Sequence, residues 1–248
     1  MAYKAENYLL ELKENYEQSP GNRDNFITPL LSNNNSGYLI PSITNSPLFK
    51  KHNLIVKRIF DIVISVIVTS LLLWWALPLL ALLIKIDSRG PVFFIQKRNK
   101  KDGRLFHCIK LRTMWVNEHA DMLTSVLNDN RVTRLGKFLR LSHLDELPQF
   151  INVLAGDMSV IGPRPHMVTE NVKFKKILNY YNDRHFVKPG ITGLAQSHGY
   201  HGPVNDLSHL DKKIGYDIFY IKNWSLMMDV KILIRTMRMI SKKLKPVP

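Results

Sequence analysis

The longest uninterrupted apolar stretch of the chain covers residues 62–84, IVISVIVTSLLLWWALPLLALLI, and contains no charged side chain. A helix of this length can cross a hydrocarbon core of about 30 Å. Hydropathy alone therefore favours an ordinary transmembrane helix. Two features of the run and its flanks favour a different path through the membrane.

The first feature is the charge of the flanks. Positive residues tend to remain on the cytoplasmic side, so a simple span would translocate one of two basic clusters. The second is Pro78, which removes a backbone hydrogen bond and should bend the helix. We therefore predict a re-entrant helix hairpin that bends near Pro78, where Thr69 and Ser70 could supply side-chain hydrogen bonds. The basic clusters are Lys50, Lys51, Lys57 and Arg58 before the run, and Lys85, Arg89, Lys97, Arg98, Lys100 and Lys101 after it.

Residues 1–50 show no sustained helical or strand period. After the amphipathic stretch YLLELKENY they are rich in Asn, Ser and Pro, a composition typical of loops. They also lack the basic start and apolar run of a secretory signal peptide. We predict a polar N-terminal extension that is mostly disordered or loosely docked.

The remainder of the chain has the pattern of a globular domain. The stretch PVFFIQKRNKKDGRLFHCIKLRTM alternates apolar and polar residues around Lys101, Asp102 and Gly103, which predicts a β-hairpin. Helices are predicted over 115–128 and 167–182. Two further short amphipathic helices are predicted in RLGKFLRLSHLDELPQFINVLAGDM, the second ending near Gly156.

A turn-rich stretch, KPGITGLAQSHGYHGPVND, precedes the C-terminal helices. The last helix has one apolar and one basic face, which suits a membrane surface. The predicted fold class is α-rich α+β. Its parts are the extension (1–50), a re-entrant membrane helix hairpin (51–89), and a small domain (90–248) with a β-hairpin and membrane-surface amphipathic helices.

Charge narrows the range of partners. The chain has 35 Lys and Arg against 20 Asp and Glu, a formal net charge of +15. Residues 1–50 hold four of the basic and five of the acidic side chains, so the excess lies in the remainder. Such an excess attracts nucleic acid, an anionic bilayer or phosphorylated ligands. Cys108 is the only cysteine, which excludes an internal disulfide and fits a reducing compartment or a cytoplasmic membrane face.

The adjacent acids Asp145 and Glu146 are the most specific candidates for chemistry. Pro148 is best tolerated in the first turn of a helix, which predicts a helix that begins near Asp145. Both carboxylates then lie at a helix N-terminus, where bound phosphate is also favoured. Adjacent helical side chains point about 100° apart, so one could attack phosphorus while the other holds a metal. A capping box of Ser142 and Asp145 is the alternative, and the residues alone leave both interpretations open.

Basic residues that could bind phosphate occur in two other motifs. In GPRP, two prolines stiffen the backbone around Arg164, whose planar guanidinium makes paired hydrogen bonds. In KLRTM, Lys110 and Arg112 alternate on a predicted strand and would share a face. The alternatives are a solvated turn and a solvent-facing strand.

Other known site types are not indicated. The glycine-rich stretch KPGITGLAQSHGYHG could let backbone amides approach a phosphate, or could be a structural loop. His185, His198 and His201 lack the spacing of a zinc site. The sequence contains no P-loop, nucleotide-fold glycine fingerprint or serine-hydrolase elbow.

Several motifs follow one another in a specific order. They are KRIFD, the apolar run with its proline, GPVFFIQKR, KLRTM, RVTRLGKFLR, LDELPQFINVLAGDMSVIGPRP, VKPGITGLAQ and YIKNWSLMMD. In this order they resemble the bacterial monotopic phosphoglycosyl transferases, the polyprenyl-phosphate sugar-1-phosphate transferases of glycan assembly. The resemblance covers about residues 54–240. It implies a bacterial inner (cytoplasmic) membrane protein whose catalytic domain lies on the cytoplasmic face.

The resemblance also implies an activity. Family members move a sugar-1-phosphate from a UDP-sugar to undecaprenyl phosphate and release UMP, a first membrane step of exopolysaccharide, capsule or O-antigen-type glycan assembly. By resemblance, Asp145 is the nucleophile and forms an aspartyl phosphosugar intermediate. Glu146 would bind Mg²⁺, with Asp157 a weaker candidate near the metal.

The remaining implied roles concern substrate and partners. Arg164, Lys110 and Arg112 would bind phosphate, and Asp217 is a weaker candidate near the nucleotide. Membrane lipids are expected partners and nucleic acid is not. The oligomeric state is left open, with a homo-oligomer as one possibility. The alternative function is a non-catalytic, basic, membrane-anchored binding or scaffolding module, which gives no reason for LDELPQ together with GPRP.

The chain departs from the family pattern in three places. Only about fifty polar residues precede the apolar run, where many relatives carry several membrane spans. His201 stands where many members have Arg, and Lys222 where an acid is expected. The resemblance therefore leaves the sugar open, although GYHG and NWSLMMD favour a hexose-1-phosphate of an exopolysaccharide pathway.

Overall fold

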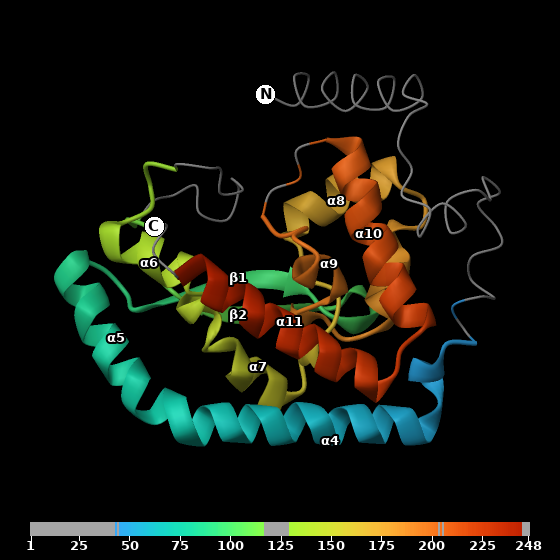
Figure 1. Cartoon of the computed structure of the whole chain (residues 1–248). Helices are drawn as coiled ribbons and strands as arrows, with labels where there is room; N and C mark the ends of the chain where they lie inside the picture. The colour runs from blue at the N-terminus through green and yellow to red at the C-terminus, as the bar shows by residue number, and fades with distance from the viewer. Residues whose placement is uncertain (1–42, 44, 117–128, 203, 205, 245–248) are drawn as a thin grey trace.

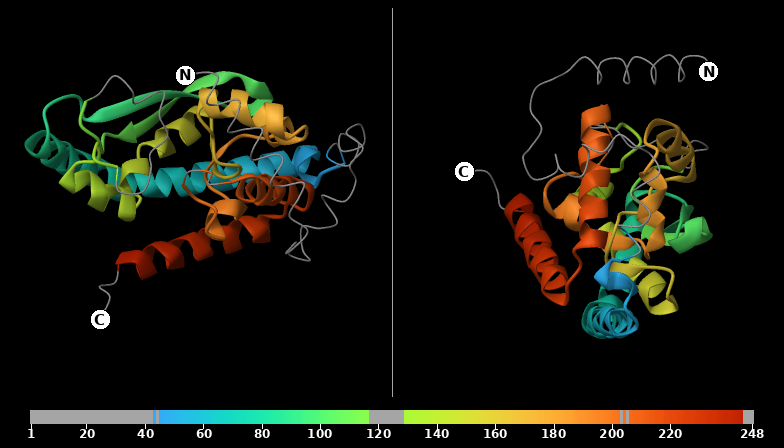
Figure 2. Two further views of the ribbon diagram at one scale, coloured as in Figure 1. Left: turned by 90° about the horizontal axis from the view of Figure 1, so that it is seen from above. Right: turned by 90° about the vertical axis from the view of Figure 1, so that its right-hand side faces the viewer.

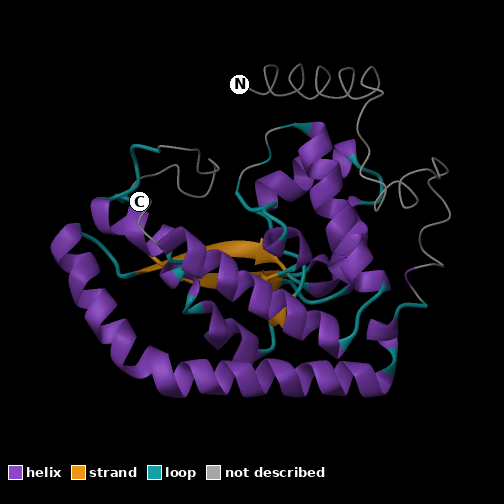
Figure 3. Ribbon diagram, viewed as in Figure 1, coloured by secondary structure: helices purple, strands orange, loops and turns teal. Residues whose placement is uncertain are grey.

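The computed structural model describes residues 43, 45–116, 129–202, 204 and 206–244. Within these ranges the protein consists mainly of helices around two small sheets, and Figure 3 shows the strands near the centre of the domain. The predicted helix-rich fold with a small β element is confirmed. Most of the N-terminal extension, and most of the helix predicted over 115–128, lies outside the described residues.

One helical segment, Lys51–Asp87, is apolar and long enough to cross a membrane, as judged by length and composition. It comprises α4 (Lys51–Val68), a wider π-helical turn (Thr69–Leu73) and α5 (Trp74–Asp87). Figure 1 shows α4 running straight along one edge of the domain and α5 curving away from that line. The interruption therefore lies upstream of Pro78 rather than at it. This is the side a proline disturbs, because its ring meets the carbonyl four residues earlier.

Three polar residues of α4 face the domain. Lys57, Asp61 and Ser65 follow a four-residue spacing and are all buried. Lys57 forms an ion pair of 2.9 Å with Asp229, and Asp61 accepts a hydrogen bond of 2.8 Å from the Ser159 hydroxyl. Viewed along its axis, α4 has the domain on one side only (Figure 2). The opposite face of the segment exposes Leu54, Ile55, Ile59, Ile62, Val63, Val66, Ile67, Leu71, Trp74, Leu79, Leu82 and Ile86.

One of the two side chains expected to hydrogen-bond near the bend does not do so among the described residues. The Thr69 hydroxyl is buried and has no hydrogen-bond partner among the described residues. The prediction for Thr69 is therefore wrong. The π-helical turn at this point is formed without a hydrogen bond from the Thr69 hydroxyl.

The predicted β-hairpin is present. Strands β1 (Phe93–Asn99) and β2 (Leu105–Leu111) pair antiparallel, with Phe93 opposite Leu111 and Asn99 opposite Leu105. The turn passes through Asp102 and Gly103, both with positive φ, and Gly103 adopts that conformation at no steric cost. The hairpin follows α5 directly and carries Lys110 toward the centre of the domain.

A second sheet was not predicted. Strands β3 (Ser159–Ile161) and β4 (Gly190–Thr192) pair in parallel within two stretches expected to be turns. A Cβ atom on Gly190 would lie 2.1 Å from the backbone nitrogen of Gly162. Glycine is required there because the backbones of the two segments approach so closely. The glycine-rich stretch is thus partly structural.

Helices surround these sheets. A buried cluster joins α7, α10 and α11 with β3, and includes Val153, Ile161, Ile214 and Ile232. A second cluster joins α5, β2 and α6 through Leu80, Ile84, Leu111 and Leu139. The remaining elements are η1 (Pro47–Phe49), η3 (Lys101–Gly103), α6 (Arg134–Leu141), η4 (Leu144–Glu146), α7 (Gln149–Ala155), α8 (Val168–Ile177), η5 (Tyr181–Phe186), α9 (Leu194–Ser197), α10 (Leu207–Lys222) and α11 (Leu226–Leu244).

Candidate active site

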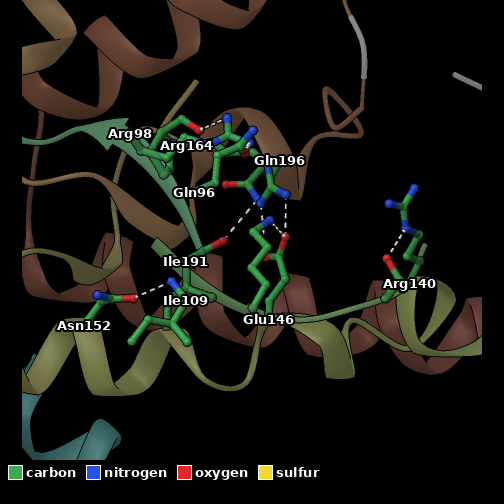
Figure 4. Close-up of polar contacts among 12 residues, drawn as sticks. Gln96, Arg98, Ile109, Arg140, Glu146, Asn152, Arg164, Ile191 and Gln196 are labelled. Atoms are coloured by element: carbon green, nitrogen blue, oxygen red, sulfur yellow. Dashed lines mark hydrogen bonds and ion pairs between the residues drawn. The ribbon is translucent and has the colours of Figure 1, made fainter. Parts of the chain in front are cut away.

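Glu146 lies at the centre of a buried group of charges. Its side chain is 8% exposed, and Lys110 of β2 donates to its Oε1 atom at 2.9 Å. Arg164 donates from Nη1 to Oε2 at 3.1 Å and from Nη2 to Oε1. Figure 4 shows the guanidinium of Arg164 and the carboxylate of Glu146 pointing toward each other. The structure thus brings together three residues predicted from separate motifs.

The side chains of this group shift one another's pKa values. Burial alone would raise the pKa of Glu146, but the nearby Arg164 and Lys110 lower it well below its usual value. The same ion pair raises the pKa of Arg164 above its usual value despite burial. Both side chains are therefore charged across the physiological pH range.

Asp145 lies in a different environment from its neighbour. It is buried, and loss of hydration together with the adjacent negative charge of Glu146 raises the pKa of Asp145 to about 6. The cations Lys110, Arg140 and Arg164 oppose this shift. Near pH 7 the carboxylate remains mostly ionised, yet it is more basic than an exposed aspartate. Two adjacent acids with separated pKa values can perform two different tasks.

The capping-box alternative is not formed. Ser142 donates its hydroxyl to the carbonyls of Phe138 at 2.8 Å and Leu139 at 3.2 Å, within the preceding helix. The turn η4 begins after His143 and has no side-chain cap hydrogen bond. The acids lie on this turn just before α7 rather than in the first turn of the helix, so the predicted start of the helix was a few residues early.

Arg164 is held from its backbone side. The Arg184 guanidinium donates to the Arg164 carbonyl and forms an ion pair of 2.9 Å with Asp217. Arg184 and Asp217 are only 2% and 3% exposed, so this pair is a buried support for the GPRP turn. The structure therefore places Asp217 behind Arg164. Its contacts give no support to a direct position at the nucleotide.

Two predicted residues make contacts elsewhere. Arg112 donates to the carbonyls of Ser88 and Arg89 at 2.8 Å, and so secures the link between α5 and β1. It lies just past β2, and its guanidinium donates hydrogen bonds to this link rather than to Glu146. Asp157 forms an ion pair of 2.6 Å with Lys100. Neither residue is brought into the group around Glu146 by these contacts.

The site can be tested for its fit to Mg²⁺. Among the described residues, no group of three or more His, Cys, Asp or Glu side chains could hold a metal ion. A Mg²⁺ ion commonly binds through one or two carboxylates and the phosphates of its substrate, with waters completing the shell. Glu146 fits that role, since its Oε2 atom accepts a single hydrogen bond here and an oxygen has two lone pairs.

Other side chains near the acids had no clear motif in the sequence. Arg184 and Arg140 belong to unremarkable basic stretches. His143, His201 and Lys243 come from three distant segments, and only the folded chain brings them together. Of these side chains, only Arg140 could have been predicted, because it is a basic residue in the helix just before the acid pair.

The described residues combine a buried pair of acids, with Lys110 and Arg164 bound to one of them, and a helical segment that is apolar and long enough to cross a membrane. The sequence model of one family, described as bacterial sugar transferase, matches residues 52–243. The chain therefore belongs to the bacterial sugar transferase family.

Individual relatives agree with that assignment. The chain is 44% identical to a UDP-glucose:undecaprenyl-phosphate glucose-1-phosphate transferase of Klebsiella pneumoniae, over 81% of this chain and 43% of the relative. It is 43% identical to a UDP-N-acetylgalactosamine-undecaprenyl-phosphate N-acetylgalactosaminephosphotransferase of Aeromonas hydrophila, over 85% and 47% respectively. Identity to the exopolysaccharide production protein PSS of Rhizobium leguminosarum bv. phaseoli is 39%, over 74% and 94%. The chain thus spans less than half the length of the first two relatives and nearly all of the third.

Proposed function

We propose that the protein is a phosphoglycosyl transferase, which moves a sugar-1-phosphate from a UDP-sugar to undecaprenyl phosphate and releases UMP. The observation that carries the proposal is the buried pair of Asp145 and Glu146, with Lys110 and Arg164 arranged around it, in a member of the bacterial sugar transferase family. The names of the relatives support both substrates. They name different sugars, and we favour a hexose-1-phosphate.

Asp145 serves as the nucleophile in this proposal. A carboxylate oxygen of Asp145 attacks the β-phosphorus of the UDP-sugar, and the bond from that phosphorus to the oxygen of UMP breaks. An oxygen of undecaprenyl phosphate then attacks the same phosphorus, which releases the Asp145 carboxylate and yields a lipid diphosphate sugar. Covalent catalysis of this kind divides one difficult displacement into two.

The surrounding cations have separate roles. Arg164 can bind two phosphate oxygens in parallel through its planar guanidinium, while Lys110 acts as a single point charge. Glu146 keeps both of them in place before substrate binds, which preorganises the site. Glu146 would also hold Mg²⁺, which neutralises pyrophosphate charge when bound.

The arrangement of the apolar helix supports attachment to one face of the membrane. A helix of 37 residues is about 55 Å long, well beyond a hydrocarbon core of about 30 Å. The polar face of α4 is buried against the domain and its outer face is apolar. We propose that the α4–α5 segment is the re-entrant membrane element and that the catalytic domain lies on the cytoplasmic face of the inner membrane. The reaction would be a first membrane step of exopolysaccharide or related glycan assembly.

The test is UMP release by the full chain in detergent, with Mg²⁺, undecaprenyl phosphate and a panel of UDP-sugars. We expect turnover with at least one of them. With the donor alone we expect a single burst of UMP and a phosphosugar attached to Asp145, detected by mass spectrometry. Asp145→Asn should abolish both signals. Asp102→Asn is a matched control, because Asp102 is exposed at the hairpin turn and Asn tolerates its positive φ.

Two results would contradict the proposal. Normal turnover by Asp145→Asn would refute the nucleophile. If no UDP-sugar yields UMP while the protein binds acidic vesicles, the basic membrane-anchored scaffolding function is favoured instead. Salt-sensitive retention of DNA in detergent would favour nucleic-acid binding.

A further inference from the structure

A second basic group lies beside the acid pair. It consists of His143, in the link between α6 and η4, His201, in the loop after α9, and Lys243, in the last turn of α11. Lys243 Nζ lies 2.8 Å from His201 Nε2, and the rings of His143 and His201 meet edge to face at 6.5 Å between centroids. We call these three residues the His–Lys cluster.

The His–Lys cluster adjoins the site described above. His143 is the N-cap of η4, the turn that carries Asp145 and Glu146. Figure 1 shows the C-terminal end of α11, which carries Lys243, close to α6, the helix that leads to His143. The cluster therefore lies beside the acid pair.

Within the part of the chain that the structure describes, this cluster has no carboxylate partner of its own. Lys243 makes no ion pair with any described residue, while Glu146 is already paired with Lys110 and Arg164. Lys243 uses one of its three N–H donors toward His201. Burial lowers the pKa of His201 to about 4, and its Nε2 accepts a hydrogen bond from Lys243, so Lys243 carries the positive charge of the pair and an anion beside it is favoured.

The proposed reaction needs two anion sites at different times. During the first step Lys110 and Arg164 hold the phosphates of the donor. The acceptor is a phosphate monoester with a charge of about −1.5 to −2, and it must approach a phosphorus that already bears negative oxygens. Cations on the side of approach reduce that repulsion.

The position of α11 indicates where that second anion comes from. The helix exposes Leu226, Met227, Ile234 and Met237, and its last turn carries Lys243. A helix with exposed apolar residues and basic side chains suits the surface of a bilayer. A lipid phosphate held at such a surface would lie beside α11, whose last turn carries Lys243.

We propose that His201 and Lys243, with His143 beside them, bind the phosphate of the lipid acceptor. The inference rests on the proposed function, because it assigns one substrate of that reaction to one side of the site. Lys110 and Arg164 serve the donor, and the His–Lys cluster serves the acceptor. The phosphate takes up the free donors of Lys243 and lies next to the phosphosugar on Asp145.

The experiment separates the two half-reactions in the full chain. Lys243→Gln and His201→Gln are compared with wild type for the donor-only burst of UMP and for the KM of undecaprenyl phosphate. We expect the burst to be unchanged and the KM for the acceptor to rise about tenfold, the loss expected for one charge-assisted hydrogen bond. Lys243→Arg should restore most of the affinity. Lys242→Gln is the matched control, because Lys242 is the exposed neighbour on the same helix.

The outcomes are distinguishable. A smaller burst, or weaker binding of the UDP-sugar, would assign the cluster to the donor and overturn the inference. An unchanged KM for the acceptor in both variants would also overturn it. An equal rise in KM for Lys242→Gln would show a general surface attraction rather than a site. Failure of the wild-type protein to release UMP from any UDP-sugar would refute the proposed function itself.

Discussion

Arg164 forms two hydrogen bonds with the carboxylate of Glu146, with Nη1 donating to Oε2 at 3.1 Å and Nη2 to Oε1. This paired contact joins the GPRP turn to the turn that carries both acids. It leaves Asp145, one residue earlier, as the acid with the raised pKa. The two adjacent carboxylates therefore differ in pKa because their surroundings differ.

The paired contact predicts that lysine cannot replace Arg164. Arg164→Lys keeps the positive charge but loses the planar fork that binds two oxygens at once. We expect kcat/KM for the UDP-sugar to fall at least about tenfold, which corresponds to about 1.4 kcal/mol. Arg104→Lys, at an exposed arginine of the hairpin, should leave kcat/KM unchanged. Equal kinetics for Arg164→Lys and wild type would show that the fork is dispensable.

The raised pKa of Asp145 predicts an acidic limb in the pH profile. Burial and Glu146 raise this pKa from 3.8 to about 6, so the protonated form, which cannot attack phosphorus, accumulates as the pH falls through 6. The rate of the donor-only UMP burst should drop about tenfold for each pH unit below that point. Rapid-quench measurement between pH 4.5 and 8 checks this. A limb near pH 4 would mean that the nucleophile has an ordinary pKa.

The buried pair of Asp217 and Arg184 predicts a supporting role. Asp217→Asn leaves the charge of Arg184 buried without its partner, which should destabilise the fold by about 3–5 kcal/mol. Melting temperature measures the loss. In the double variant Asp217→Asn/Arg184→Met, stability should recover in part, because the buried guanidinium without a partner is then gone.

Kinetics separate that support from direct contact with substrate. If Asp217 acts through the Arg164 backbone, Arg184→Met alone should raise the KM for the UDP-sugar in the same way as Asp217→Asn. A rise for Asp217→Asn alone would instead place Asp217 at the nucleotide, as the sequence resemblance implies.

The one-sided placement of the domain on α4 predicts that both ends of the membrane segment lie on the same face. Lys50→Cys and Arg104→Cys introduce exposed thiols on either side of the segment. In right-side-out and inverted vesicles, an impermeant maleimide should label both positions from the cytoplasmic side only. The wild-type chain is the control, since its single thiol, Cys108, is buried. Labelling of the two positions from opposite sides would establish a simple span.

Local patterns determined a large part of this protein. A charge-free run of residues is sufficient to predict a membrane helix, because the hydrophobic length needed is a property of the bilayer. Alternation around Asp102 and Gly103 is sufficient for the hairpin, because strand period and turn chemistry are local. The acid pair, GPRP and KLRTM likewise identified three side chains that meet in the fold, Glu146, Arg164 and Lys110.

Only the tertiary structure decided how these parts are used. Lys110 and Arg112 are two residues apart, yet one reaches Glu146 and the other secures the link from α5. The polar face of α4 is buried because Lys57 meets Asp229, 172 residues later. Neither helical nor strand periodicity specifies a partner at that separation. Packing between distant segments therefore decides which charged side chains surround the acid pair. The sequence alone predicts only some of these side chains.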